Sequence, residues 1–346
     1  MKIVLIKGDG IGPEIVTEIE KLITTIGSIS DLNFKLIFVD INEDHFRQTG
    51  LLIPSQLKQI CKDADAIWLG PISDNSPLKD YSESSVLISI CDTLGLDLHL
   101  KRLKPLHSLQ TISTDNILDV LIIQSQFSNI TIPGQLPVKN ENLEDFEIFT
   151  TVYFHKKISE LYSFAAQLNE SNKRVLLALP EELSQDNSPW IKALTIFSEK
   201  NFKIQILRWD KLIFQFLHNP ENLDVIITLP PFGQILSRMG AAIEGGLGVA
   251  YDFYQNQKGK TALFHVLHPA SKRFVGKDAA NPLGAFLCLG EMMQFLKYPG
   301  VNSVIRDIVE ESVLAGWTTR DLGGSMGTCE IGDFICSKMS DKLNPA

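Results

Sequence analysis

Cysteine is scarce in this sequence, and its distribution limits the chemistry to expect. The 346 residues include five cysteines that lie far apart and form no Cys-x-x-Cys pair, namely Cys61, Cys91, Cys288, Cys329 and Cys336. An odd and scattered set is typical of reduced thiols and does not fit a disulfide framework. The sequence therefore predicts a cytoplasmic protein.

The sequence also lacks long apolar runs and a basic region. Its first apolar stretch, "MKIVLI", is too short for a signal peptide or a membrane span. The formal net charge is -9 and no basic tail occurs, whereas nucleic-acid-binding proteins usually carry a basic face. We therefore expect neither a membrane segment nor a nucleic-acid partner.

What the sequence does contain is an alternation of two patterns. Short β-rich runs such as "KIVLI", "DAIWLG" and "RVLLALP" alternate with helical patterns such as "GPEIVTEIEKLITTIG". This alternation favours an α/β fold with a largely parallel sheet. A length of 346 residues favours two domains. Residues 126–150 are polar and contain two prolines, so they form either an arm with a partner contact or a plain solvent loop.

A glycine-rich turn follows the first predicted strand. The stretch "KGDGIGPEI" has three glycines within five residues and opens the first predicted helix. Glycine lets the backbone approach a ligand closely, and a helix N-terminus favours an anion or another polar group. The spacing differs from the G-x-G-x-x-G of Rossmann dinucleotide sites. The turn is therefore either one wall of a nucleotide site or only a tight turn.

Two further stretches complete a pattern that extends over nearly the whole chain. They are "HPASKRFVGKDAANP" at 268–282 and "TTRDLGGSMGTCEIGD" at 318–333. Together with "GDGIGPE", they make the chain resemble the β-decarboxylating dehydrogenases, the family of isocitrate and 3-isopropylmalate dehydrogenase. The resemblance implies a two-domain isopropylmalate-dehydrogenase-like fold that is not a Rossmann fold. It also implies a larger, cofactor-side domain of residues 1–98 and 249–346, and a smaller domain of residues 99–248 with the dimer contacts.

The family binds NAD or NADP, and the resemblance assigns several residues to that cofactor. Arg273 stands where NAD-using members have an acidic residue, and with Lys272 it makes the segment similar to NADP-using members. Arginine suits a 2′-phosphate because its planar fork pairs with phosphate oxygens; the alternative is a solvated loop. We therefore expect NAD or NADP, with NADP favoured, held by Ile11, His268, Lys272, Arg273, Gly276 and Asn281.

The substrate side of the family's site matches poorly. The family binds substrate carboxylates with three arginines; Lys101 keeps the charge at one of these positions, and Arg102 lies next to it. The family's catalytic lysine is replaced by Pro180, and its acid-base tyrosine falls near Thr131. Proline has no proton to exchange, so the resemblance assigns no catalytic residue here.

The family's metal ligands are changed as well. The resemblance implies that Mg²⁺ or Mn²⁺ is held by one aspartate from the neighbouring subunit and two from the same subunit. The first persists as Asp210, while Gln234 and Arg238 replace the other two. A cation next to an arginine is repelled by about 4 kcal/mol per unit charge at ~4 Å and an effective dielectric of about 20. The replacements therefore argue against a Mg²⁺ or Mn²⁺ site. Arg238 either pairs with Asp210, contacts a substrate or points to solvent.

Two hypotheses follow for function. In the first, the chain is a pseudoenzyme of this family, without metal-dependent oxidative decarboxylation, that binds a nucleotide or another small molecule or serves as a regulatory partner. In the second, it is an NAD(P)-dependent oxidoreductase that acts on a 2-hydroxy acid similar to 3-isopropylmalate through an altered, metal-independent site. We prefer the first because residues that act as one unit are lost together. In both, the resemblance implies a homodimer or a pair with a paralogous subunit.

Overall fold

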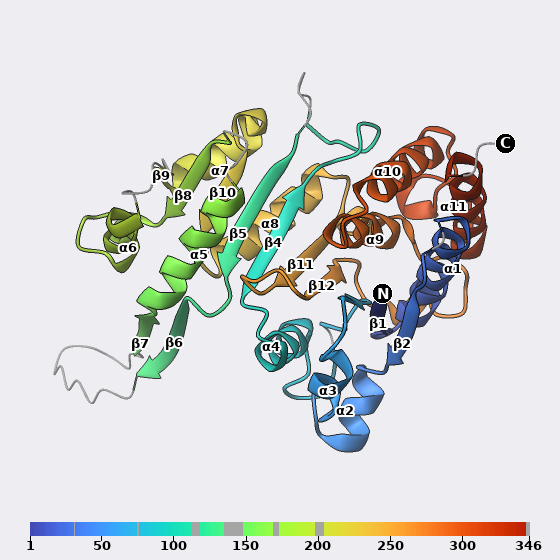
Figure 1. Cartoon of the computed structure of the whole chain (residues 1–346), viewed down its shortest axis with the longest axis horizontal. Helices are drawn as coiled ribbons and strands as arrows, with labels where there is room; N and C mark the ends of the chain where they lie inside the picture. Colours follow the sequence, from blue (N-terminus) through green and yellow to red (C-terminus); the bar gives the residue numbers. More distant parts are fainter. Residues whose placement is uncertain are drawn as a thin grey trace. The chain divides into compact units, whose positions relative to one another are not determined.

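The chain divides into two compact units, both drawn in Figure 1. The first consists of Met1–Asp119 and Ser237–Ala346, and the second of Val120–Leu236. The domain bounds expected from the resemblance, at 98/99 and 248/249, stay a prediction. The computed structural model describes residues 1–30, 32–74, 76–112, 118–134, 148–168, 173–197 and 204–343, except for the side chains of residues 131–134, 148, 149, 196 and 197.

The sheet of the first unit is built from apolar runs of the sequence. Its strand order is β2 (Lys35–Val39), β1 (Lys2–Ile6), β3 (Ala66–Leu69), β12 (Ala262–Val266), β11 (Tyr251–Gln255) and β4 (Leu98–Leu103). The pairs from β2 to β12 are parallel, whereas β11 is antiparallel to β12 and to β4. β1, β3 and β12 are buried at nearly every position, as expected for strands that are covered on both faces.

Helices pack on this sheet and on one another. α9 (Leu283–Phe295) contacts β11 and β12, α10 (Pro299–Leu314) contacts α9, and α1 (Gly12–Ser30) lies beside α11 (Thr328–Leu343) (Figure 1). α9 is buried continuously from Leu283 to Met293, so it forms the centre of the unit. Further helices of this unit are α2 (Glu43–Thr49), α3 (Leu57–Cys61) and α4 (Glu83–Leu94).

The second unit has its own parallel strands. Their order is β5 (Val120–Ser125), β10 (Val225–Thr228), β8 (Val175–Leu179) and β9 (Ile204–Arg208). Its helices include α5 (His155–Gln167), α6 (Pro189–Phe197) and α7 (Trp209–His218), and α8 (Phe232–Ile243) begins in this unit and ends in the first. The predicted α/β architecture with a largely parallel sheet is confirmed.

The segment 126–150 contains an antiparallel pair of strands. β6 (Asn129–Gly134) pairs with β7 (Ile148–Tyr153), and residues 135–147 between them lie outside the described residues. That this segment is an arm with a partner contact stays a prediction.

The glycine-rich turn after β1 is shaped by close backbone contacts. Gly8 has φ +75°, and a Cβ there would lie 2.2 Å from the carbonyl oxygen of Pro71. Gly10 has φ +54°, and a Cβ there would lie 3.0 Å from the backbone of Ala270. Between them, Asp9 accepts hydrogen bonds from Glu43 N (2.7 Å), Ser73 N (2.9 Å) and the Tyr81 hydroxyl (2.7 Å). The turn therefore joins four segments of the first unit.

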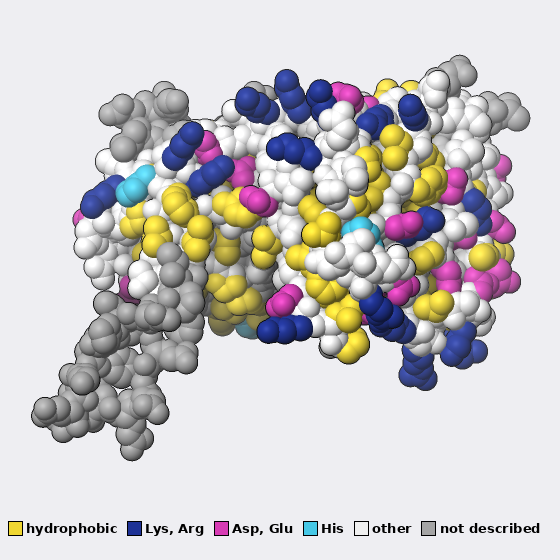
Figure 2. Space-filling model, turned by 90° about the horizontal axis from the view of Figure 1, so that it is seen from below, with side chains coloured by type: hydrophobic (Ala, Val, Ile, Leu, Met, Phe, Trp, Pro, Cys, Tyr) yellow, Lys and Arg dark blue, Asp and Glu magenta, His cyan; other side chains and the backbone are white. Residues whose placement is uncertain are grey.

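The surface carries charges of both signs and some apolar side chains. On the face drawn in Figure 2, acidic, basic and hydrophobic side chains are interspersed over the described residues. All five cysteines are free thiols, and three of them are buried. Within the described part of the chain, none of the helices combines the length and the apolar character that a membrane crossing requires.

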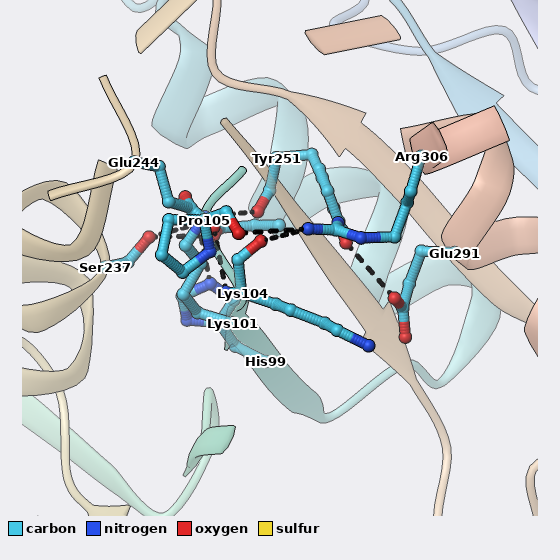
Figure 3. Close-up of polar contacts among 10 residues, drawn as sticks. His99, Lys101, Lys104, Pro105, Ser237, Glu244, Tyr251, Glu291 and Arg306 are labelled. Carbon is cyan, nitrogen blue, oxygen red and sulfur yellow. Dashed lines mark hydrogen bonds and ion pairs between the residues drawn. The ribbon is translucent and has the colours of Figure 1, made fainter. Parts of the chain in front are cut away.

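A buried ion pair lies beside β4 and β11. The side chain of Lys101 has no exposed surface, and its Nζ donates to Glu244 Oε2 (2.5 Å) and to the Tyr251 carbonyl (3.1 Å). Glu244 also accepts from Lys104 N (3.2 Å), and Figure 3 shows these contacts converging from three segments. Burial raises the pKa of Glu244, while Lys101 opposes the shift. Both side chains of this ion pair are therefore buried, and each needs the other to compensate its charge.

Removing one partner should destabilise the first unit strongly. We expect Lys101→Met to lower the free energy of unfolding by about 3 to 5 kcal/mol, because Glu244 is left as a buried, unpaired carboxylate. The double variant Lys101→Met/Glu244→Gln should regain much of this loss. Urea denaturation followed by circular dichroism measures both. An unchanged midpoint for Lys101→Met would show that the pair contributes nothing.

Candidate functional site

A pocket of about 730 Å³ lies in the first unit, among the loops that follow β12 and precede α9 and α11. This volume is within the range of small-molecule sites, roughly 300 to 1,000 Å³. Its lining is partly apolar and partly polar, and the polar part contains cations, an amide, an imidazole and two carboxylates. These polar residues include His268, Arg273, Lys277, Asp278, Asn281, Arg320 and Asp321.

His268 contributes an uncharged ring to this pocket. Its Nδ1 lies 2.9 Å from the Pro269 carbonyl, and because a carbonyl only accepts, Nδ1 carries the hydrogen. Burial lowers the pKa of His268, although Asp321 and the Pro269 carbonyl oppose the shift. The ring is therefore neutral near neutral pH, with Nε2 as an acceptor.

Asn281 is held in one orientation. Its Nδ2 donates to Asp321 Oδ2 (2.8 Å) and its Oδ1 accepts from Leu283 N (2.9 Å). Asp321 in turn accepts from the Thr319 hydroxyl. Asn281 is 3% exposed. The amide is therefore positioned before any ligand binds, which reduces the ordering cost of binding.

The loop that carries the cations is attached to the N-terminal half of the unit. Lys272 Nζ donates to Glu43 Oε2 (2.5 Å), and Gly276 N donates to Glu14. Arg273 and Lys272 lie in a short 3₁₀ turn, Lys272–Phe274, and Arg273 is the one that lines the pocket. The structure thus separates two cations that the sequence grouped together.

Besides Lys272, two further residues expected at the cofactor, Ile11 and Gly276, lie outside the lining of this pocket. The Ile11 side chain is fully buried, so it packs in the core behind the glycine turn. Gly276 has φ +70° and uses its N–H for Glu14. Asp278, which the sequence pattern did not single out, lines the pocket and accepts from Cys329 N at the start of α11 (2.8 Å). No periodicity signals that role.

The basic residues expected to bind substrate have acidic partners. Lys101 pairs with Glu244, as described above. Arg102 donates through Nε and Nη2 to Asp119 (2.8 and 2.7 Å), and its Nη1 lies 3.6 Å from Glu291. Both cations are thereby neutralised inside the protein.

Asp210 and Arg238 each form an ion pair with another residue. Asp210 accepts from Arg208 Nε (3.0 Å) and Nη2 (3.2 Å), and this arginine lowers the pKa of Asp210. Arg238, on α8, donates from Nη2 to Glu83 Oε1 (2.8 Å). The expected pair of Arg238 with Asp210 is therefore not formed within this chain. Arg238 pairs with Glu83 instead, and Asp210 pairs with Arg208.

Glu83 is the residue of this region that the sequence did not indicate. It is the first residue of α4 and lies between the capping-box residues Ser82 and Ser85, and its side chain is 14% exposed. Burial raises the pKa of Glu83 to about 7, although Arg238 opposes the shift. The capping pattern predicts a helix start here, but the contact with a residue 155 positions away has no local signal.

A buried network of polar side chains lies next to Arg238 and includes Ser237, the residue before it on α8. Asp252 Oδ2 is 2.9 Å from His99 Nε2, and the Ser237 hydroxyl donates to both Asp252 oxygens (2.7 and 2.9 Å). Burial raises the pKa of Asp252, but His99, Lys101 and Ser237 outweigh it and lower the pKa. His265, which pairs with Asp252 in the β11–β12 register, is fully buried, and burial lowers its pKa to about 3.

The chain is similar to known proteins over nearly its whole length. Residues 2–335 match the family described as isocitrate/isopropylmalate dehydrogenase. The chain is 25% identical to 3-isopropylmalate dehydrogenase of Carboxydothermus hydrogenoformans, over 98% of this chain and 94% of that protein. It is 26% identical to homoisocitrate dehydrogenase of Methanocaldococcus jannaschii, over 99% of both. The apo structure of a β-decarboxylating dehydrogenase from Thermococcus kodakarensis superposes with a TM-score of 0.81 at 20% identity, covering 99% of this chain and 97% of that one.

The chain belongs to the isocitrate/isopropylmalate dehydrogenase family. The predicted family and its fold are confirmed, because the match and the superposition both extend over nearly the full length. The family is normally NAD(P)-dependent with Mg²⁺ or Mn²⁺. The 730 Å³ pocket fits a nucleotide, since it offers a neutral ring, a fixed amide and several cations.

The family's metal does not fit the residues present. Gln234 is exposed on α8, one turn before Arg238, and Arg238 brings a positive charge. Among the described residues, no three His, Cys, Asp or Glu side chains are grouped so that they could hold a metal ion. Pro180 begins a 3₁₀ turn, Glu181–Leu183, and it has no ionisable group. Thr131 lies on β6, and its side chain lies outside the described residues.

Changing the two replaced positions should create a metal site. We expect Gln234→Asp/Arg238→Asp to bind Mn²⁺ where the unaltered protein does not, because two oxygen ligands are added and one fixed positive charge is removed. Free Mn²⁺ is measured by its electron paramagnetic resonance signal during titration. Arg238→Met is the matched control, because it removes the charge without adding a ligand. Equal binding by the double variant and the control would contradict the assignment of these positions.

Proposed function

We propose that this chain is a nucleotide-binding member of its family that does not carry out metal-dependent oxidative decarboxylation. The observation that supports it most directly is the ion pair of Arg238 and Glu83 at 2.8 Å. The pair occupies α8 at the position where the family resemblance places a metal ligand. A guanidinium there repels a divalent cation, and Glu83 holds it in place.

The chemical groups of the family's reaction are also missing. Pro180 provides no proton where the resemblance places the catalytic lysine. Lys101 and Arg102 are paired with carboxylates of this chain, so a substrate carboxylate would have to displace Glu244 or Asp119. These changes belong to one mechanism, and loss of several parts removes the activity as a unit.

The nucleotide we propose is NADP in preference to NAD. Arg273 lines the pocket, and none of the ion pairs among the described residues involves it. Its planar fork suits a 2′-phosphate. Asn281 and His268 would hold the base, and the bound nicotinamide would supply a hydride acceptor. In this arrangement Lys272 positions the loop through its ion pair with Glu43, and Arg273 binds the 2′-phosphate of the ligand.

A second candidate function is favoured by one observation. The pKa of Glu83 is about 7, which suits a general acid or base near neutral pH, and Arg238 lies beside it. A metal-independent NAD(P)-linked oxidation of a 2-hydroxy acid would use such a pair. We place it second because three other positions of the family's chemistry hold Pro180, Thr131 and Gln234. These residues cannot replace the lysine, the tyrosine and the aspartate that the resemblance implies there.

Ligand titration and turnover assays test this proposal together. We expect NADPH to bind more tightly than NADH, measured by nicotinamide fluorescence, because only NADPH carries a 2′-phosphate with which Arg273 can pair. Arg273→Met should weaken NADPH roughly tenfold or more, the value of one or two charged hydrogen bonds, and leave NADH unchanged. Lys272→Met is the matched control, and it should alter both cofactors alike.

The turnover arm uses isopropylmalate and isocitrate with Mg²⁺ or Mn²⁺ and either cofactor. We expect no production of NADH or NADPH above background, followed by absorbance. Turnover at ordinary enzyme rates would contradict the loss of decarboxylation. If neither cofactor bound, the nucleotide site and the second candidate function would both be wrong.

We also propose that the chain assembles, as a homodimer or with a paralogous subunit. α7 exposes Phe214 (62%) and Leu217 (45%), three residues apart on one face of the helix. Exposed large apolar side chains that gather on one face favour an interface with another protein.

Charged residues on this face of α7 should prevent assembly. If the chain is a homodimer, Phe214→Glu/Leu217→Glu should reduce the molar mass in solution to that of one chain, because a buried interface excludes carboxylates. Light scattering after gel filtration measures the mass. Ile88→Glu is the control, since Ile88 is 54% exposed on α4. A monomeric unaltered protein leaves a paralogue as the partner, which co-expression and co-purification would have to show.

A further inference from the structure

The second unit has a pocket of its own, between α7 and the strands β8 and β9. Its volume is about 480 Å³, which lies within the range of small-molecule sites, roughly 300 to 1,000 Å³. None of the residues that line it also lines the nucleotide pocket. We call it the α7 groove, and its lining includes Leu176, Gln205, Leu207, Lys211, Phe214 and Asn219.

α7 runs back along β8, and one contact at each end fixes this direction. In the first turn of α7, Trp209 Nε1 donates to the Ala178 carbonyl near the end of β8 (3.0 Å). Just after α7, Asn222 accepts from Arg174 Nη1, directly before the start of β8 (3.4 Å). The first turn of α7 therefore lies by the end of β8, and the last turn lies by its start.

Lys211 is the cation at the N-terminal end of the groove. It is exposed, and none of the ion pairs among the described residues involves it. The carboxylates next to the start of α7 are bound elsewhere, since Asp210 and Glu181 both pair with Arg208 (3.0 Å each). No carboxylate of the described residues lines the groove. The ammonium group of Lys211 is therefore available to an anion.

The opposite end of the groove is polar but offers no uncompensated charge. Asn219 follows Lys211 by eight residues, which is about 12 Å along a helix, and Gln205 lines the groove near the start of β9. Arg174 also lines this end, but Asp224 accepts from its Nε (3.0 Å). Within the described part of the chain, the side-chain amides of Gln205 and Asn219 make no hydrogen bond. They can therefore donate to and accept from a ligand.

Apolar side chains form the middle of the groove, between these two ends. Leu176 on β8 is 5% exposed, whereas Phe214 on α7 is 62% exposed, and Leu207 on β9 completes the wall. A ligand that covers these side chains removes apolar surface from water. An aromatic ring also gains from packing on a phenylalanine ring. The middle of the groove therefore favours a flat aromatic body.

We propose that the α7 groove binds a small aromatic acid that carries a hydroxyl or amide group at the end opposite its carboxylate. The carboxylate pairs with Lys211, and the ring covers the apolar wall. The polar end forms hydrogen bonds with the amides of Gln205 and Asn219. Binding is non-covalent and requires neither a metal nor a nucleotide, so it is a function separate from that of the first unit.

Phe214 belongs both to the α7 groove and to the apolar face that it forms with Leu217. Leu217 does not line the groove, whereas Lys211, Gln215 and Asn219 do, and their spacing of four residues places them on one side of the helix. A partner subunit on the apolar face would therefore lie beside a bound ligand. Because Lys211 is outside that face, the ligand site can be tested whether or not the chain assembles.

Calorimetric titration of the full chain with 6-hydroxy-2-naphthoate tests this proposal, because this ligand carries a carboxylate and a hydroxyl at opposite ends of a flat double ring. We expect one molecule to bind per chain. 6-Hydroxy-2-naphthamide lacks the negative charge and should bind roughly tenfold more weakly or worse, the value of one charged hydrogen bond. 2-Naphthoate lacks the hydroxyl and should bind roughly two- to tenfold more weakly.

A lysine variant tests which residue pairs with the carboxylate. Lys211→Met should bind 6-hydroxy-2-naphthoate and its amide with equal affinity, since the preference for the acid comes from the ammonium group. Lys192→Met is the matched control, because Lys192 is an exposed lysine of α6 in the same unit and does not line the groove. It should keep the preference for the acid.

A second pair of variants tests where the ligand lies. Leu207→Glu should abolish binding, because it places a carboxylate on the wall that the ligand covers. Ile206→Glu is its control: Ile206 is 40% exposed, and its side chain points to the other face of the sheet, because successive residues of a strand alternate. Circular dichroism confirms that each variant is folded.

Several outcomes would overturn the proposal. They are no binding of 6-hydroxy-2-naphthoate, a preference for the acid that persists in Lys211→Met, or equal affinities of Leu207→Glu and Ile206→Glu. The titration is repeated with saturating NADP⁺. Competition between the two ligands would place the aromatic acid in the nucleotide pocket of the first unit and would also contradict the proposal. The nucleotide titration depends on Arg273, so its result can fail independently of this one.

Discussion

The carboxylate of Asp9 is the constraint on which the candidate pocket of the first unit depends. It accepts hydrogen bonds from Glu43 N, Ser73 N and the Tyr81 hydroxyl. Glu43 in turn pairs with Lys272, so the loop that presents Arg273 is positioned through contacts that begin at Asp9. A buried carboxylate needs all its donors. The turn, the neighbouring loops and the pocket wall are therefore formed together.

The same electrostatic reasoning applies to the ion pair of Arg238 and Glu83. A fixed positive charge on α8 opposes a divalent cation and attracts an anion. Glu83 moderates that charge, and its raised pKa makes the moderation depend on pH. The Asp252 group below remains satisfied by His99 and Ser237. The polar contacts of Asp252 are therefore satisfied independently of Arg238.

Much of the fold could be predicted from the sequence, whereas only part of the site could. The alternation of strands and helices and the three glycine-containing stretches indicated the architecture and the family. They also placed His268, Arg273 and Asn281 beside one pocket. The partners of Lys101, Arg102 and Arg238 were not predictable in the same way. Each ion pair joins segments that are separated in the chain, and local spacing contains no information on which acid lies opposite.

The sequence by itself determined which chemical groups this protein has. Proline at position 180 cannot exchange a proton and arginine at position 238 cannot bind a metal, since these are properties of single side chains. Tertiary structure alone decided how the remaining groups behave. It neutralised Lys101 with Glu244, turned Lys272 away to Glu43, and buried Glu83 enough to raise its pKa to about 7. The physical reason is that charge depends on desolvation and on neighbours in space, and both arise only when distant segments pack together.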